Sequence, residues 1–303
     1  MDVRVVEVGP RDGLQNEKLT VPEDVKLRFI ARLAAAGLSE IEATSFVSPK
    51  WVPQLADADA IWPKLPPGPL YSALVPNRRG LDRALALDVR RIALFTAASD
   101  TFCRKNINVS RDESLHEFRE IVSLLRERAG KYWVRCYIST AFECPYEGRI
   151  SPDQVLPVVE TLLDIGVDEI CLGDTIGVAS PTEVKSLTRA LAELVPPEQL
   201  AYHFHDTRGT ALSNVWTALE MGVRCFDASA GGLGGCPYAP GAGGNLATED
   251  LVYLLEREGV ESPLDLRALA EASLEVLELL GRAPSARAQL AQLSRASGSP
   301  CAS

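Results

Sequence analysis

The sequence predicts a closed parallel (β/α)8 barrel, the TIM-barrel architecture of the α/β class, with extra helices at its C-terminal end. Three observations lead to this fold class. The chain has 303 residues, short β-branched runs alternate with longer segments of helical period, and eight such runs can be counted at a spacing of ~30 residues. A doubly wound open sheet is the competing fold. It would carry a glycine fingerprint at its first strand-to-helix turn, which the segment GPRDG does not supply.

Each predicted strand is a short run rich in β-branched and other apolar residues. The eight runs are residues 3–8, 40–44, 70–75, 91–95, 133–140, 169–172, 201–205 and 224–228. Amphipathic segments between them predict helices, several of which begin with Pro, Ser or Thr and end before a glycine. These helices are expected at residues 23–36, 79–87, 112–129, 152–165, 182–194 and 211–221.

The C-terminal part departs from this repeat. Residues 263–281 predict an additional helix outside the barrel, and from Arg282 onward Ala, Ser, Arg, Gln and Gly dominate. We therefore expect a single catalytic TIM-barrel domain over residues 1–281, followed by a flexible tail over residues 282–303.

Composition and charge exclude several classes of protein and several kinds of partner. Hydrophobic residues make up 46% and charged residues 24%, which is ordinary for a globular protein and excludes a disordered or collagen-like chain. The net charge of −10 argues against nucleic acid or an anionic membrane surface as a partner. Apolar runs stay below the ~18 residues of a membrane span, and the chain begins directly in a strand pattern, so we expect a cytoplasmic protein. Seven scattered cysteines without a CxxC pair predict reduced thiols.

The active site of such a barrel lies at the carboxyl ends of its strands, and there a histidine pair is the strongest signal. His203 and His205, in HFHDT, are two residues apart on a strand and therefore point to the same face. In a closed barrel strand eight lies between strands seven and one, so Asp12 and Asn245 become neighbours of the pair. Two nitrogens and two oxygens suit Mg²⁺ or Mn²⁺, whereas two histidines and one aspartate could also hold Zn²⁺ or Fe²⁺. The alternative is a pair of core histidines that hydrogen-bond to their neighbours.

Two further features lie at the same end of the barrel. Arg11 is a permanent cation that could hold a carbonyl or enolate oxygen, or simply form a salt bridge with Glu42. Residues 231–244 include seven glycines together with Cys236, which is typical either of a lid or of a flexible connector with a buried thiol. Glu249 and Asp250 open the last barrel helix, where interaction with the helix dipole would explain both.

Six segments, in order along the chain, resemble 3-hydroxy-3-methylglutaryl-CoA lyases. They are GPRDGLQNE, EATSFVSPKWVPQ, CPYEG, LGDTIG, HFHDT and GGLGGCPYAPGAGGNLATEDLVY, and the resemblance runs from about Val3 to Glu256. It implies a divalent-metal-dependent carbon–carbon lyase of leucine catabolism and ketone-body formation. Such an enzyme cleaves 3-hydroxy-3-methylglutaryl-CoA to acetyl-CoA and acetoacetate, with no organic cofactor, and a homodimer is expected.

The resemblance also assigns roles to residues. The metal ligands it implies are Asp12, His203, His205 and Asn245. The catalytic residues it implies are Arg11, Asp12, His203 and Cys236, and the substrate-binding residues are Arg11, Glu42 and Asp174. In the expected mechanism Asp12 or Cys236 takes the proton of the 3-hydroxyl group, Arg11 stabilises the thioester enolate, and His203 protonates the carbanion.

One departure and several alternatives accompany this interpretation. Family members often carry an aromatic residue where this chain has Arg208, so another acyl-CoA substrate is possible, such as citramalyl-CoA or a longer-chain 3-hydroxyglutaryl-CoA. A condensing synthase of the isopropylmalate or homocitrate type shares an early Arg-Asp pair and an HxH motif, but the glycine-rich segment argues against it. Two further alternatives are disfavoured. The intact site residues argue against a binding scaffold that has lost catalytic turnover. The alternating α/β pattern argues against a non-haem iron oxygenase.

Overall fold

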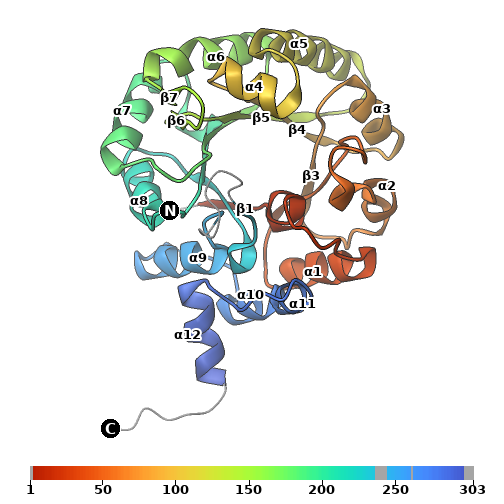
Figure 1. Cartoon of the computed structure of the whole chain (residues 1–303), viewed down its shortest axis with the longest axis vertical. Helices are drawn as coiled ribbons and strands as arrows, with labels where there is room; N and C mark the ends of the chain where they lie inside the picture. The colour runs from red at the N-terminus through yellow and green to blue at the C-terminus, as the bar shows by residue number, and fades with distance from the viewer. Residues whose placement is uncertain (1–2, 236–243, 261, 297–303) are drawn as a thin grey trace.

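The computed structural model describes residues 3–235, 244–260 and 262–296 and confirms the barrel (Figure 1). Eight parallel strands close in the order β1-β10-β9-β8-β5-β4-β3-β2. They are β1 (Arg4–Glu7), β2 (Glu40–Ser45), β3 (Leu70–Leu74), β4 (Arg91–Ala97), β5 (Trp133–Ser139), β8 (Glu169–Asp174), β9 (Leu200–Phe204) and β10 (Cys225–Ala228). All eight coincide with predicted runs, and β10 closes the ring between β9 and β1 as expected.

Helices form the outer ring around these strands (Figure 1). They are α1 (Glu23–Ala35), α2 (Ala58–Ile61), α3 (Arg78–Ala86), α5 (Arg111–Glu127), α6 (Pro152–Ile165), α7 (Pro181–Leu191), α8 (Ala211–Glu220) and α9 (Thr248–Arg257). Helix α4 (Asp100–Ile107) instead lies inside this ring, over the end of the barrel. Local sequence sets several of their starts. For example, the Ser110 and Glu113 side chains bond each other's backbone amides in a capping box at the start of α5.

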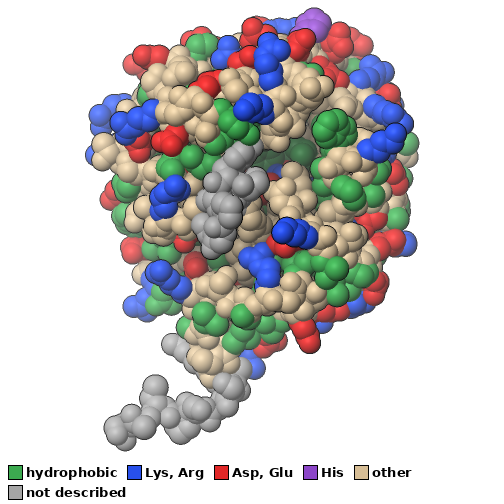
Figure 2. All heavy atoms as spheres, in the orientation of Figure 1, with side chains coloured by type: hydrophobic (Ala, Val, Ile, Leu, Met, Phe, Trp, Pro, Cys, Tyr) green, Lys and Arg blue, Asp and Glu red, His purple; other side chains and the backbone are tan. Residues whose placement is uncertain are grey.

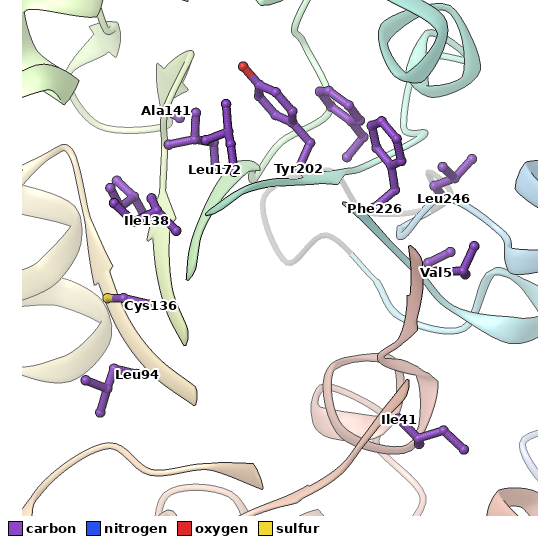
Figure 3. Packing of buried hydrophobic residues seen from close by; sticks show 14 of the residues in the cluster. Val5, Ile41, Leu94, Cys136, Ile138, Ala141, Leu172, Tyr202, Phe226 and Leu246 are labelled. Atoms are coloured by element: carbon purple, nitrogen blue, oxygen red, sulfur yellow. The ribbon is translucent and has the colours of Figure 1, made fainter. Parts of the chain in front are cut away.

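Alternate residues of the strands sort into two layers. Val5 packs between the strands and the helices, whereas Val6 packs inside the barrel; Cys136 and Tyr137 divide in the same way. Figure 3 shows outward-facing members of the first layer, such as Leu94 and Ile41, pointing toward the surrounding helices. The period of two along each strand therefore separates the structural core from the interior that carries the site.

The amino-terminal end of the barrel interior is filled by charged side chains. Arg4 pairs with Glu40 at 2.7 Å and with Glu169 at 2.5 Å, and Arg91 pairs with the other oxygen of Glu40 at 2.7 Å. Each of these residues begins its strand. Because opposite charges alternate around the ring, the polar groups there are paired rather than left as uncompensated buried charges.

The structure adds elements that the sequence did not predict. Helix α4 follows β4, and a short hairpin of β6 (Glu143–Cys144) and β7 (Gly148–Arg149) is formed by the CPYEG segment. The helix expected over residues 263–281 is two helices, α10 (Leu266–Ala272) and α11 (Leu274–Leu279), which meet at the buried Ser273.

The expected flexible tail is wrong for residues 287–296, which form helix α12 (Arg287–Ala296). This helix contacts α9 and α10, and the Gln289 side chain is fully buried. Its Nε2 donates to the Ala270 carbonyl and to Ser273 Oγ, both at 2.9 Å. Composition misled the prediction because Ala, Gln and Arg, which look like low complexity, are good helix formers. Residues 297–303 lie outside the described part of the chain.

Two further expectations concern the cysteines and membranes. The five described cysteines are buried and unpaired, in agreement with the prediction of reduced thiols: Cys103, Cys136, Cys144, Cys171 and Cys225. No helix among the described residues is long and apolar enough to cross a membrane.

We predict that Gln289→Ala lowers the free energy of unfolding by about 1–3 kcal/mol, because it leaves the buried Ala270 carbonyl without its side-chain donor. Chemical denaturation measures the change. Gln292→Ala, the same substitution at a partly exposed position of α12, is the control and should cost less than about 0.5 kcal/mol. Equal, small effects of the two substitutions would show that α12 does not pack stably.

Candidate active site

A cavity of about 490 Å³ lies at the carboxyl-terminal end of the barrel. The predicted site residues Arg11, Asp12, His203 and His205 line it, together with Tyr137. Figure 2 shows the molecule from one end of the barrel, with a hollow near the centre of the face and Lys and Arg side chains around it. The site is therefore a recessed pocket whose floor carries titratable groups, on a protein whose overall charge is negative.

Arg11 and Asp12 come from η1 (Gly9–Gly13), a short π-helix that follows β1. Arg11 is 5% exposed, and its guanidinium pairs with Asp12 Oδ1 at 2.5 Å and with Glu42 through its Nε. Tyr137 donates its hydroxyl to the second Glu42 oxygen at 3.0 Å, and the guanidinium lies 5.4 Å from the Tyr137 ring centre. The salt bridge to Glu42 is thus present, and it holds Arg11 at the cavity wall.

The two histidines line the same cavity, as their spacing predicts: His203 lies on β9 (Leu200–Phe204), and His205 directly follows this strand. Their ring centres are 5.2 Å apart, and His203 Nε2 lies 3.9 Å from Asp12 Oδ2. Ligand atoms of Asp12, His203 and His205 all lie within 4.8 Å of one another. Burial lowers the pKa of His205 to about 4, and the neighbouring His203 adds to this effect. His205 is therefore neutral at pH 7, which is the form that binds metals.

The pKa of Asp12 is lowered, like that of His205, whereas the pKa of His203 is raised. Burial alone would raise the pKa of Asp12, but the charges of Arg11 and His203 outweigh it and hold the pKa below its usual range. Burial alone would lower the pKa of His203, but the hydrogen bond to Asp227 and the charge of Asp12 raise it instead. Asp12 is accordingly an ionised carboxylate beside the two rings.

Asn245 completes the group that the sequence predicted. It pairs with His205 in an isolated bridge, and its Nδ2 donates to Asp12 Oδ2 at 3.0 Å and to the Leu233 carbonyl at 3.1 Å. These two bonds fix the amide, so that Asn245 Oδ1 is buried without a hydrogen-bond partner, as is His205 Nδ1. Buried polar atoms are nearly always satisfied, and a cation between the carboxylate, the rings and the amide oxygen would satisfy them. The residues present fit a divalent metal ion.

Asp174 and Arg208 have different surroundings from those that the sequence suggested. Asp174 ends β8, and its two oxygens accept from the Val178 and Ala179 amides at 3.0 Å each. Burial raises the pKa of Asp174 to about 6. Arg208 Nη1 donates to the Ile176 carbonyl at 2.7 Å, so both residues hold the LGDTIG loop. Among the described residues the cavity is lined by Gly173 and Thr175 of that loop, and not by Asp174 or Arg208.

Two buried carboxyl groups connect the loops of the site, and the sequence assigned a role there to neither. Glu7 Oε1 accepts from the Gly9 and Ala230 amides at 2.7 and 3.0 Å, which joins η1 to η5 (Ala230–Gly232). Glu249 accepts from the Gly231 amide with both oxygens at 2.9 Å. Burial raises the pKa of Glu7 to about 7 and that of Glu249 to about 8. Helix-dipole interaction alone does not explain Glu249, because its carboxyl group holds the beginning of the glycine-rich segment.

The prediction for Cys236 cannot be compared with the structure, because Cys236 lies outside the described residues. Interior residues that escaped the sequence analysis include Tyr137, which contacts Glu42, and Asp227, which hydrogen-bonds to His203. A signal was present for both, because a polar side chain inside a strongly apolar strand points to a paired position in the barrel interior.

Comparison with known proteins identifies the family. Residues 2–276 match the sequence model of the HMGL-like family. The chain is 51% identical over 282 residues to the mitochondrial hydroxymethylglutaryl-CoA lyase of Bos taurus. The aligned region covers 92% of this chain and 86% of that protein. The chain belongs to the hydroxymethylglutaryl-CoA lyase family. The family resemblance carried by the six sequence segments is thereby confirmed.

Solved structures of hydroxymethylglutaryl-CoA lyases share the fold. The enzyme from Pseudomonas aeruginosa superposes with a TM-score of 0.93 at 45% identity, covering 97% of this chain and 98% of that chain. A lyase from Acinetobacter baumannii, in complex with coenzyme A and 3-methylmalate, gives a TM-score of 0.89 at 41% identity, covering 99% and 97%. This chain is therefore a barrel enzyme of the hydroxymethylglutaryl-CoA lyase family.

We predict that Glu249→Gln raises the melting temperature relative to the unmodified protein, by an amount that grows as the pH rises from about 5 to about 8. The native Glu249 carboxyl group has a raised pKa and keeps its proton where the unfolded chain has lost it. Its contribution to stability is thus present at low pH and is lost as the pH rises toward 8. Glu256→Gln, an exposed position on the same helix, is the control. A pH-independent difference for Glu249→Gln would contradict the prediction.

Proposed function

We propose that this protein cleaves 3-hydroxy-3-methylglutaryl-CoA to acetyl-CoA and acetoacetate, with Mg²⁺ or Mn²⁺ held by Asp12, His203, His205 and Asn245. The observation that carries the proposal is the convergence of Asp12, His203 and His205 in one cavity, with Asn245 hydrogen-bonded to Asp12. Buried atoms of His205 and Asn245 have no hydrogen-bond partner among the described residues. Oxygen donors beside two imidazoles suit these cations. Membership in the hydroxymethylglutaryl-CoA lyase family supports the reaction class.

A divalent cation at this position would supply Lewis-acid chemistry, polarising substrate oxygens and favouring loss of the hydroxyl proton. The protein's own groups do the rest. Asp12 or Cys236 takes the proton from the 3-hydroxyl group, either directly or through water. As the hydroxyl carbon becomes the ketone of acetoacetate, the carbon–carbon bond breaks and its electron pair passes to the thioester enolate. Protonation of that enolate carbon gives acetyl-CoA.

Arg11 stabilises the negative charge that develops on the thioester oxygen during cleavage. Its guanidinium is buried at the cavity wall and stays charged at every working pH. Glu42 and Asp12 fix its orientation before the reaction, so that little reorganisation is needed when charge appears on the thioester oxygen. Glu42 therefore supports substrate binding through Arg11, while Asp174 acts on the shape of the neighbouring loop.

His203 was expected both as a metal ligand and as the acid that protonates the carbanion. Its Nδ1 is taken by Asp227 at 3.0 Å, so that a single nitrogen, Nε2, faces Asp12. One nitrogen cannot hold a cation and deliver a proton at the same time. We keep the ligand role for His203, which leaves the Cys236 thiol as the group to protonate the carbanion.

An acyl-CoA partner fits the shape and lining of the cavity. The lining continues from the titratable floor past Asn106 and Asn108 at the end of α4 to Trp51, which is 75% exposed at the mouth. The Lys and Arg side chains around the hollow in Figure 2 suit the phosphates of coenzyme A. The related Acinetobacter baumannii lyase was solved with coenzyme A and 3-methylmalate. A homodimer, a cytoplasmic location and a single catalytic domain over residues 1–281 complete the proposal.

The test is a product assay with purified protein, racemic 3-hydroxy-3-methylglutaryl-CoA and either Mg²⁺ or Mn²⁺, followed by mass spectrometry. We expect acetyl-CoA and acetoacetate in equal amounts, and their loss when EDTA is present. Cleavage of citramalyl-CoA or of a longer-chain 3-hydroxyglutaryl-CoA without cleavage of this substrate would contradict the proposed substrate but retain the reaction class.

We predict that His205→Ala weakens Mn²⁺ binding by more than about tenfold, because one donor of a four-residue site is lost. Isothermal titration calorimetry of the metal-free protein measures it. His116→Ala is the matched control: His116 is the one histidine outside the site, exposed on α5, and its substitution should leave Mn²⁺ affinity unchanged. An unchanged affinity in His205→Ala would remove His205 from the metal site.

A further inference from the structure

We propose that Asp227, held by Arg135, is the positioning residue that fixes the proton of the His203 imidazole on Nδ1 and turns Nε2 toward Asp12. The inference rests on the proposed metal-dependent function in so far as Nε2 is a metal ligand. The arrangement itself is a property of the protein's own side chains and can be tested without a metal ion.

Strand pairing places the two residues side by side. Asp227 of β10 is the direct partner of His203 of β9 in the parallel ladder, and its carboxyl group contacts Arg135 and Cys171 inside the barrel. His203 Nδ1 lies 3.0 Å from Asp227 Oδ2. The Asp227 side chain is fully buried, so no water competes for this bond.

The surroundings of Asp227 decide the direction of that hydrogen bond. Arg135 Nη2 donates to Asp227 Oδ1 at 2.6 Å, and Cys171 Sγ donates to Oδ2 at 3.7 Å. A carboxylate paired with an arginine carries no proton and can only accept. His203 Nδ1 must therefore be the donor, and in the neutral ring the lone pair lies on Nε2, 3.9 Å from Asp12 Oδ2.

Arg135 is itself fixed on several sides. It is 2% exposed and pairs with Glu169 at 3.2 Å, its neighbour in the ladder between β5 and β8. Its guanidinium lies 4.9 Å from the Tyr137 ring centre, and the Tyr137 ring in turn meets the His203 ring edge-on at 6.2 Å. Arg135 is thus held in one orientation inside the barrel, and it fixes the Asp227 carboxylate that orients His203.

The other histidine lacks this support. His205 Nδ1 is buried without a hydrogen-bond partner among the described residues, so no carboxylate holds that nitrogen. The two rings of the site therefore differ at Nδ1: the protein engages that atom in His203 and leaves it unpaired in His205. Carboxylate groups behind metal-binding histidines raise the basicity of the ring and typically change metal affinity by about 10- to 100-fold when they are replaced.

Asp227→Asn gives a sharp test, because Arg135 dictates how the new amide must lie. The arginine can only donate, so the amide oxygen must face Arg135 and the amide nitrogen must face His203. His203 Nδ1 would then have to accept, and its proton would move to Nε2, the atom that faces Asp12. The substitution keeps the shape of the side chain and reverses the tautomer.

The measurement combines nitrogen NMR of the histidine rings with Mn²⁺ titration. With only three histidines in the chain, the rings can be assigned by substituting His116 and His205 in turn. At a pH high enough for the spectrum to show a neutral His203 ring, we expect this ring to carry its proton on Nδ1 in the unmodified metal-free protein and on Nε2 in Asp227→Asn. Asp227→Asn should also bind Mn²⁺ about 10- to 100-fold more weakly.

Glu169→Gln is the matched control, since it converts the other buried carboxylate on Arg135 to an amide without touching His203. It should leave the His203 tautomer as it is and change Mn²⁺ affinity by less than about twofold. A proton on Nε2 in the unmodified protein overturns the inference even if Asp227→Asn does not fold. Unchanged Mn²⁺ affinity in a folded Asp227→Asn overturns it as well. Failure of the unmodified protein to bind Mn²⁺ would instead contradict the proposed function, and the tautomer would still decide this inference.

Discussion

Strand β10 pairs with β1 on one side and with β9 on the other, and the whole site depends on this closure. Asp12 follows β1, while His203 lies near the end of β9, so the two belong to different ends of the chain. Without the four-residue strand between them, neither the carboxylate–imidazole group nor the bond from Asp227 to His203 would form. The first and last strands of the barrel, β1 and β10, are thus paired next to the candidate active site.

Charged groups inside the barrel form two layers: one at the amino-terminal end, where the charges neutralise one another, and one above it that orients His203. At the amino-terminal end Arg4, Glu40, Arg91 and Glu169 neutralise one another. Above them Arg135 and Asp227 link this paired layer to His203. Burying so many charges contributes little net stability by itself, since desolvation offsets the attraction. What the arrangement provides is fixed orientation of the groups at the mouth.

The strands and the grouping of Asp12 with the two histidines were predictable because each rests on a short-range rule. The period of two places His203 and His205 on one face, and barrel closure places Asp12 beside them. Helix α12 and the partners of Asp174 were not predictable in this way. Gln289 is buried only because α9 and α10 provide a surface for it, and Asp174 is engaged by amides of a loop whose conformation no local pattern reveals. Tyr137 and Asp227 have their roles through partners on other strands, more than 20 residues away in sequence.

Residues 249 and 250 link two parts of the chain that otherwise have little in common. Glu249 accepts from Gly231, at the start of the glycine-rich segment, while Asp250 accepts from the Ala288 amide at 2.6 Å and from the Arg287 amide at 3.3 Å, at the start of α12. The same turn of α9 therefore anchors both a loop of the site and the last helix. Shortening the protein after Arg282, as its composition invites, would leave the Asp250 carboxylate without these two amides, right beside the residue that holds Gly231. The C-terminal helix belongs to the surroundings of the site, and an expression design that ends before residue 296 would alter the enzyme it is meant to simplify.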